Sequence, residues 1–278
     1  MSENTVKCPI CDKYSGEFWG QEYRGYRIVR CRECGLRYAD PQTVDAVQVY
    51  QDDYFADKAD RMFDPARLLL VLKSDIDSFG NIAGVIRDRL NPQLRLLDIG
   101  TGRGSFLILC KLLGFNHILG TDISRSNVEF LERFGIETKI GVIEDLNLGK
   151  FDIITFHHVL EHLPDPGAFL THISGMLSDG GVGHLLIPNE GSLNSRFKSL
   201  MSKMKLKKRP FKHLAPGHHL WFYEKQTIIR LLDKYGFKID YIGTRATEKS
   251  RGIASRLIHR LFDYFMINTW LEVVFSKK

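Results

Sequence analysis

The sequence predicts an α/β fold in which a mainly parallel sheet is covered by helices on both faces. From about residue 60 onward, short apolar runs alternate with longer amphipathic segments, as strands and crossover helices do in such a sheet. One apolar run leads directly into the glycine-rich turn at 100–104. The chain has 278 residues and an apolar share of 44%, which is the composition of a globular protein and not of a disordered one.

The expected helices carry terminal signals. Pro65 lies in the first turn of a helix over Asp64–Leu90, and Gly135 follows a helix over Ser126–Phe134. The other expected helices are Ser105–Leu113, Pro166–Leu177, Glu224–Tyr235 and Ile253–Ile267. The expected strands between them are Leu94–Ile99, His117–Thr121, Phe151–Phe156, Val182–Pro188, Phe237–Gly243 and Trp270–Phe275. No internal repeat interrupts this order.

The first 40 residues hold too little apolar sequence to form a core of their own. They contain two Cys-x-x-Cys pairs, Cys8 with Cys11 and Cys31 with Cys34, around a predicted hairpin over Phe18–Val29. Four thiolates at this spacing are typical of a tetrahedral zinc site, and they leave no open position for a substrate. The alternatives are a redox pair or unrelated cysteines. We favour a structural zinc.

Charge is distributed unevenly. The net charge is +6, and residues 196–212 contain eight lysines and arginines but no acid. This segment is predicted to clamp a nucleotide diphosphate or a lipid phosphate, to contact an RNA backbone, or to be a solvated loop. No apolar stretch is long enough to span a membrane, and the N-terminus lacks the pattern of a secretory signal. We therefore expect a cytoplasmic protein.

The turn at 98–104 reads Asp-Ile-Gly-Thr-Gly-Arg-Gly. Its third glycine comes one position too early for a dinucleotide fingerprint, and Asp98 would repel a pyrophosphate. The next expected strand ends at another acid, Asp122, where a carboxylate can hold a ribose diol. An adenosine ligand with a cationic amino-acid tail suits both acids. These residues predict S-adenosylmethionine as the ligand.

These motifs, followed by Glu161-His162-Leu163-Pro164, resemble those of class I S-adenosylmethionine-dependent methyltransferases. The resemblance implies a seven-stranded Rossmann-like sheet that is mostly parallel, with an antiparallel last strand. The segment from Cys31 to Tyr38 resembles the zinc-ribbon leader of bacterial methyltransferases linked to surface glycans and sugar-containing metabolites.

The resemblance also implies roles for single residues. Asp98 would lie near the ligand's ammonium group, and Asp122 would bind the ribose hydroxyls. Ile123 would pack on the adenine. Val142 stands where relatives often carry an acid, so Glu144 or a backbone group is expected to meet the adenine amine. The turn under the methionine part would be formed by Gly100, Thr101, Gly102 and Gly104.

Histidines are the candidate bases. We favour His218 or His219, because a His-aromatic stretch borders the acceptor pocket in the resembled family, and we add His158 as a third candidate. His157, at the end of an expected strand, is assigned to the cofactor side, with the alternative that it or His158 faces the methyl acceptor. His158, Glu161 and His162 match a zinc-protease pattern. That pattern requires a helix, and Pro164 ends any helix there, so we exclude a protease. Two interpretations of these three residues stay open: they bind a divalent metal ion, or they form a hydrogen-bonded loop. Some relatives that methylate catechol-like quinone precursors hold a metal ion at this place.

Three segments are expected. Residues 1–45 would form the zinc ribbon and 46–92 a linker with N-terminal helices. Residues 93–278 would form the methyltransferase domain, including a basic acceptor or lid segment at 190–222 and an inserted amphipathic helix at 250–268. That helix could lie on the inner face of a membrane, or its apolar stripe could be core or a dimer face.

The favoured function is methylation, at oxygen and with a His base, of a sugar, a glycan precursor or another small metabolite. The acceptor is expected to be anionic and phosphate-bearing. The alternatives are an RNA methyltransferase that binds RNA through the ribbon and the basic loop, and a non-catalytic scaffold. The lack of a flipped-base motif weighs against nucleic acid, and the intact acids and glycines weigh against a scaffold. The oligomeric state is not predicted.

Overall fold

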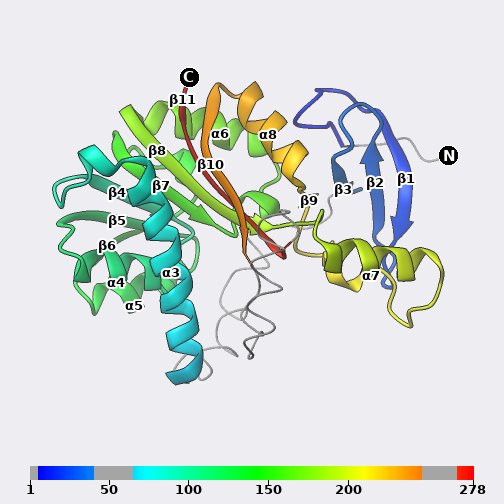
Figure 1. The fold of residues 1–278 in the computed structure, drawn as a ribbon, viewed down its shortest axis with the longest axis horizontal. Coiled ribbons are helices and arrows are strands. Elements are labelled where there is room, and N and C mark those ends of the chain that lie inside the picture. The colour runs from blue at the N-terminus through cyan, green and yellow to red at the C-terminus, as the bar shows by residue number, and fades with distance from the viewer. Residues whose placement is uncertain (1–5, 41–64, 246–267) are drawn as a thin grey trace.

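A computed structural model of the chain describes residues 6–40, 65–245 and 268–278, of which 65–70 are described by their backbone alone. Its strands form two sheets (Figure 1). The larger sheet has seven strands in the order β10-β11-β8-β7-β4-β5-β6, and the smaller has four in the order β1-β2-β3-β9. The predicted helix within 250–268 lies outside the described residues, apart from Asn268.

The seven-stranded sheet confirms the predicted fold class. The strands from β4 to β8 pair in parallel, whereas β11 runs antiparallel between β8 and β10. The last strand is therefore the antiparallel one, as expected. The strands of this sheet are β4 (Arg95–Ile99), β5 (His117–Asp122), β6 (Glu137–Ile140), β7 (Phe151–His157), β8 (Leu177–Pro188), β10 (Phe237–Arg245) and β11 (Trp270–Lys277).

Helices cover the sheet on both faces (Figure 1). The α-helices are α3 (Pro65–Val85), α4 (Ser105–Leu112), α5 (Arg125–Glu132), α6 (Pro166–Met176), α7 (Leu193–Lys203) and α8 (Lys225–Lys234). The short 3-10 helices are η2 (Arg87–Arg89), η3 (Ile143–Asp145), η4 (Leu160–His162) and η5 (Lys212–Leu214). Helix α3 ends at Val85 and not at Leu90 as predicted, because the chain tightens into η2 before Pro92.

Alternation along β4 shows how the sheet holds two cores. Leu96 packs with α3 and α4, in a cluster that includes Ile82 and Phe106. Its neighbour Leu97 points to the other face and packs with α6 and α8, in a cluster that includes Leu170. Successive residues of a strand point to opposite faces of the sheet. A continuous apolar run therefore indicates a strand that is buried on both faces.

The small sheet joins the N-terminal segment to the part of the chain that forms the larger sheet. Its strands are β1 (Gly16–Gln21), β2 (Arg27–Cys31), β3 (Arg37–Ala39) and β9 (Trp221–Phe222). β9 comes from the segment 190–222 and pairs antiparallel with β3. Buried residues of the two parts, such as Tyr38 and Trp221, belong to one core cluster. The segment 190–222 is therefore not only a loop, since it supplies α7 and a strand of this sheet.

Among the described residues, no helix is both long and apolar enough to cross a membrane.

Candidate cofactor and acceptor site

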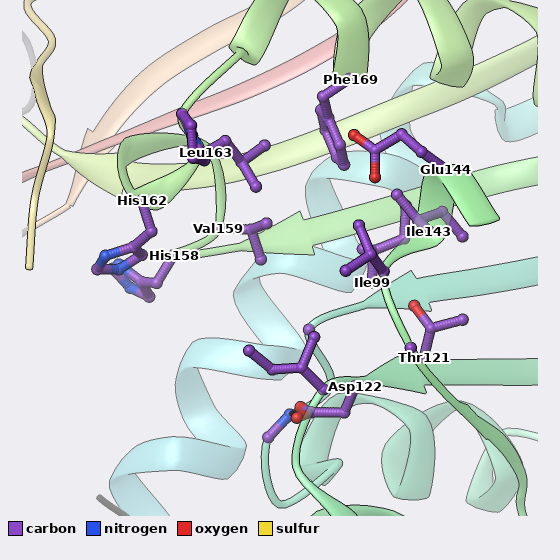
Figure 2. A pocket seen from close by; sticks show the side chains of 16 residues that line it. Ile99, Thr121, Asp122, Ile143, Glu144, His158, Val159, His162, Leu163 and Phe169 are labelled. Atoms are coloured by element: carbon purple, nitrogen blue, oxygen red, sulfur yellow. Dashed lines mark hydrogen bonds between the residues drawn. The ribbon is translucent and has the colours of Figure 1, made fainter. Parts of the chain in front are cut away.

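The strands β4, β5 and β7 end at one edge of the sheet, where they border a cavity of about 270 Å³. The cavity runs from the glycine turn to η3 and α6. Figure 2 shows His158 and His162 at one end and Glu144 with Phe169 at the other. Ligands of open α/β sheets bind at this edge, where the strand order reverses.

The three glycines of the turn have positive φ angles, 68° at Gly100, 53° at Gly102 and 66° at Gly104. A Cβ at Gly104 would lie 2.1 Å from Leu131 Cδ2, and one at Gly100 would lie 2.6 Å from Val159 Cγ2. A Cβ at Gly102 would meet no atom within 4 Å. Gly100 and Gly104 therefore permit close packing, while Gly102 leaves its side of the backbone open to a ligand.

Asp122 holds the turn in place. Its carboxylate accepts hydrogen bonds of 2.8 Å from the backbone N–H groups of Gly102 and Ser124. Burial raises its pKa, and these backbone hydrogen bonds counteract the rise. The carboxylate lines the cavity at the end of β5, as Figure 2 shows, where its remaining lone pairs can accept from ligand hydroxyls.

Asp98 lies deeper. It is buried at the end of β4 and accepts a 2.5 Å hydrogen bond from Thr155 Oγ1. Burial raises its pKa to about 7, partly against the effect of that hydrogen bond. A carboxyl group in this state gains most from a cation placed next to it.

The far end of the cavity is mainly apolar. It is lined by Ile99, Ile123 and Ile143, and by Phe169 of α6. Val142 and Glu144 border the same end, and the contact of Glu144 with an adenine amine stays a prediction. Such a slot suits the flat ring of a base, with Glu144 near its polar edge.

A second cavity of about 380 Å³ meets the first at Gly100, Gly102, His158 and His162, which line both. Its lining adds residues of α3, β4, the glycine turn, α4, β7 and β11, among them Ser74, Asp75, Asp98, Thr101, Phe106, His157 and Trp270. Thr101 Oγ1 is buried and has no hydrogen-bond partner among the described residues. Two adjoining cavities can bring two reactants together at their junction.

His158 lies at this junction in an unusual conformation. Its φ of 55° is in the left-handed region, which residues other than glycine seldom adopt. Its Nδ1 lies 3.3 Å from Oε1 of the buried Glu161, and the Trp270 ring packs edge-on at 4.7 Å. Burial by itself would raise the pKa of Glu161, but the hydrogen bond from His158 and the nearby imidazoles lower it. The pair has the geometry of a base held by a carboxylate.

His218 and His219 lie behind His162. His162 Nδ1 donates to the backbone carbonyl of His218 at 2.7 Å, and the rings of His162 and His219 are 4.9 Å apart. Burial lowers the pKa of His219 to about 4. In the part of the chain that is described, neither His218 nor His219 lines the two cavities. Their role as bases stays a prediction.

Ligand atoms of Glu161, His162 and His219 lie within 4.8 Å of one another, close enough to hold one metal ion. The sequence pattern pointed to His158, Glu161 and His162 instead. His219, which is distant along the chain, joins this group through the turn before β9. Glu161 Oε2 is buried without a hydrogen-bond partner among the described residues.

His157 begins a buried chain of polar groups that the sequence analysis missed. Its Nε2 lies 2.7 Å from His184 Nδ1, and His184 Nε2 lies 2.8 Å from Glu272 Oε1. Glu272 also pairs with Arg245. Burial holds the pKa of His157 well below its usual value, and the neighbouring His184 adds to this. A signal was present, because His184 and Glu272 are polar residues within otherwise apolar strands.

The four cysteines of the N-terminal segment come together as the spacing predicts. Cys8 Sγ lies 3.5 Å from Cys34 Sγ, and Cys31 Sγ lies 3.9 Å from Cys11 Sγ. None forms a disulfide, and all four sulfurs lie within 4.8 Å of one another. Tetrahedral zinc with Zn–S bonds of about 2.3 Å places its sulfurs about 3.8 Å apart, so the four residues could hold this metal.

A family model described as a methyltransferase domain matches residues 53–242. The chain belongs to this family. The match covers the glycine turn, the first cavity and the lining of the second cavity except Trp270, and it ends within β10. The resemblance to class I methyltransferases that the motifs indicated is thereby confirmed.

Named relatives match only part of the chain. A ubiquinone biosynthesis O-methyltransferase of Nitrobacter winogradskyi is 30% identical over 158 residues, which are 52% of this chain and 57% of that protein. The same name belongs to a Marinobacter nauticus protein, 28% identical over 46% of this chain and 56% of that protein. These matches span little more than half the length of the relatives.

Solved structures share the fold. The magnesium protoporphyrin IX methyltransferase of Synechocystis, determined with bound SAH, superposes with a TM-score of 0.56 at 18% identity. It covers 81% of this chain and 97% of its own. A SAM-dependent methyltransferase of Thermotoga maritima, described as a possible histamine N-methyltransferase, gives 0.53 at 17% identity over 81% of this chain and 96% of its own.

Proposed function

We propose that this methyltransferase transfers the methyl group of S-adenosylmethionine to a hydroxyl group of a small molecule. The observation that carries the proposal is the junction of two cavities at His158. The first cavity has Asp122, Glu144, two glycines of the turn and the apolar slot, which suit the ribose and adenine of the methyl donor. The second opens from the same junction; Asp98 lines it, so it would hold the end of the donor's methionine part and, beside it, an acceptor. The O-methyltransferase names of relatives support oxygen as the methylated atom.

The donor would be held by residues at the ends of β4 and β5. Asp98 would pair with its ammonium group and Asp122 with its ribose hydroxyls. The backbone could approach the methionine part closely at Gly100, Gly102 and Gly104. The Thr101 hydroxyl would donate a further hydrogen bond to it. Ile123 would cover the adenine, and Glu144 would accept from the adenine amine. His157 would contact this region from β7.

Methyl transfer makes few chemical demands on the protein beyond alignment. Bound S-adenosylmethionine supplies an electrophilic methyl group, and holding the acceptor in line with it contributes about 7–11 kcal/mol. We assign the base to His158, which would take the acceptor's hydroxyl proton as the new C–O bond forms and the bond between the methyl carbon and the sulfonium sulfur breaks. S-adenosylhomocysteine would be the leaving group. Glu161 would orient the imidazole and stabilise its protonated form.

The second cavity indicates the chemical class of the acceptor. Trp270 and Phe106 offer aromatic surfaces, while Ser74 and Asp75 offer hydrogen bonds. This mixture suits a hydroxylated ring, either a sugar or a phenol. Among the described residues, the lining contains no lysine or arginine. A phosphate on the acceptor would therefore have to lie outside this cavity. The N-terminal segment's resemblance to ribbons of glycan-linked enzymes supports a sugar.

We also propose that Cys8, Cys11, Cys31 and Cys34 bind one structural zinc ion. The separations of their sulfurs support this, as does the small amount of apolar surface in β1 and β2. The proposed zinc would stabilise the small sheet and take no part in methyl transfer. All four of its coordination positions would be occupied by protein sulfur.

The test is a transfer assay with methyl-labelled S-adenosylmethionine and a panel of acceptors, consisting of nucleotide sugars, free sugars, catechols and RNA. Label in a sugar or a catechol supports the proposal and identifies the acceptor class. Label in RNA alone contradicts it in favour of an RNA enzyme. Binding of S-adenosylhomocysteine with no transfer to any pool of a native extract would favour a non-catalytic scaffold.

A further inference from the structure

Helix α7 (Leu193–Lys203) turns its large apolar side chains toward solvent. Leu193 is 46% exposed, Phe197 63%, Leu200 54% and, directly after the helix, Met204 57%. At 100° per residue, their spacing places all four within a stripe about 60° wide. A surface helix normally buries such a stripe against the core.

The opposite face of α7 is the one that packs on the protein. It consists of three buried serines, Ser195, Ser199 and Ser202. Ser199 Oγ lies 3.0 Å from His213 Nε2, and Ser202 Oγ accepts a 3.0 Å hydrogen bond from the backbone of Phe211. These contacts fix the rotation of the helix. The outward direction of the apolar stripe is therefore built into the fold.

Basic side chains surround the stripe. Residues 196–212 contain eight lysines and arginines and no acid. Those classed as exposed are Arg196, Lys203, Lys205, Lys208, Arg209 and Lys212. Leu206, 61% exposed, continues the apolar surface among them. Figure 1 shows α7 at the outer edge of the molecule, beside the small sheet.

We infer that this surface, formed by α7 and residues 204–209, docks on an anionic lipid bilayer. A bilayer meets both of its properties, since lipid phosphates attract the basic rim and the acyl boundary accepts Phe197 and Leu200. A nucleic acid backbone would use the basic residues but would leave the apolar stripe in water. From the sequence alone, the helix expected to lie on a membrane was in a different segment, 250–268, and a lipid phosphate was one of several ligands considered for residues 196–212. The chain would lie on the membrane by this helix without crossing it.

The test is flotation of the full-length, zinc-loaded protein with phosphatidylcholine vesicles, with and without phosphatidylglycerol. The protein should float with the anionic vesicles and stay behind with the neutral ones. The triple variant Lys205→Ala, Lys208→Ala, Arg209→Ala should lose about fivefold in affinity per charge, which is about 100-fold in total. The double variant Phe197→Ser, Leu200→Ser should lose at least about tenfold without any change in charge.

Leu112→Ser is the matched control. Leu112 is 78% exposed on α4, outside the docking surface, so its loss should leave flotation unchanged. S-adenosylhomocysteine affinity should be unchanged in all of these variants, which keeps this test separate from that of the methyltransferase proposal. An equal loss in Leu112→Ser, or no flotation with anionic vesicles, overturns the inference. If vesicles are not bound, two further results overturn the inference. One is RNA binding that only the charge variant weakens, and the other is a dimer that the Phe197→Ser, Leu200→Ser variant dissociates.

Discussion

At the scale of single residues, the site depends on carboxyl groups whose surroundings set their charge. Asp122 is held by two backbone donors, whereas Asp98 has one hydroxyl donor and deep burial. The surroundings of the two carboxyl groups therefore suit them to bind different parts of one ligand. Asp122 can accept hydrogen bonds from hydroxyls, and Asp98, whose pKa burial raises to about 7, is stabilised as an anion by a neighbouring cation.

Cofactor binding should depend on pH through Asp98. Burial raises the pKa of this carboxyl group to about 7, so the unliganded protein loses the anion as the pH falls below 7. The ligand's ammonium group binds the anion. Affinity for S-adenosylhomocysteine should then decrease toward tenfold per pH unit below pH 7. Calorimetric titration between about pH 5.5 and about pH 8, a range that spans this pKa, would measure the change in affinity.

Asp98→Asn is the control for that dependence. This variant should bind more weakly at pH 8 and should lack the decline at lower pH. An equally steep decline in Asp98→Asn would assign the titration to another group.

His158→Asn should separate catalysis from cofactor binding. Asparagine tolerates a positive φ, so the turn can keep its shape while the base is lost. The turnover number should fall about 10²–10⁴-fold, while the affinity for S-adenosylhomocysteine should change little. His219→Ala, measured in the same assay, is the comparison. A larger loss of turnover in His219→Ala than in His158→Asn would return the base to the histidine that the sequence favoured.

At the scale of elements, the glycine turn and α7 show two different uses of local geometry. In the turn, a missing side chain permits close packing between α4 and α5. In α7, small serines face inward and large apolar residues face outward. The helix propensity and the apolar pattern of the α7 sequence do not predict which face of the helix is buried. The hydrogen bonds of its serines decide this.

Gly104→Ala should destabilise the fold. The added Cβ meets Leu131 at 2.1 Å and sits at a φ of 66°. Left-handed backbone in an L-residue costs about 1–2 kcal/mol and overpacking about 1–3 kcal/mol more. Gly114→Ala is the control, since its φ of 89° is also positive but no atom lies within 4 Å of its Cβ. Urea unfolding should show a greater loss in Gly104→Ala. Equal losses would mean that contact with Leu131 contributes nothing.

The elements that sequence reasoning missed are those whose apolar pattern is short or reversed. β6 has a single buried residue, Thr138, and β9 has only two residues. α7 reads as a charged loop because its buried positions are serines. The glycine turn, Asp98 and Asp122 were found because local sequence dictates their conformation. His184 and Glu272 were not, since only the sheet brings β8 and β11 together.

At the scale of the whole molecule, the small sheet and the methyltransferase domain are joined by an ion pair between the buried Arg37 and the half-buried Glu224. Arg37 of β3 donates to Glu224 Oε1 at 2.6 Å and to the carbonyl oxygen of Glu190 at 3.0 Å. Its guanidinium also lies 4.6 Å from the Trp19 ring centroid. This contact and the pairing of β3 with β9 connect the small sheet to the larger domain. Loss of the proposed zinc should therefore also destabilise the domain next to the small sheet.

Arg37→Ala should lower the free energy of unfolding by about 1–3 kcal/mol, because it leaves a buried carbonyl without its charged donor. Arg32→Ala is the matched control, since Arg32 pairs with Glu17 on the surface. Surface pairs contribute about 0–1 kcal/mol. Chemical unfolding of both variants would compare them, and a loss in Arg32→Ala as large as in Arg37→Ala would contradict the joining role.

Removing the proposed zinc should unfold the small sheet and lower the melting temperature of the chain. Cys31→Ser should reproduce the effect and reduce the metal content measured by mass spectrometry. Cys110→Ser, which changes a cysteine buried in the other core cluster, should keep the metal. A metal-free chain with an unchanged melting temperature would contradict a structural role for zinc.

The most direct test of the methyltransferase site is calorimetric titration of the purified chain with S-adenosylhomocysteine. The protein should bind one equivalent at micromolar concentrations. Asp122→Asn should weaken binding at least about tenfold, because a carboxylate that accepts ribose hydroxyls is replaced by a neutral amide. An absence of binding by the folded, zinc-loaded protein, or full affinity in Asp122→Asn, would contradict the assignment of the first cavity to the methyl donor.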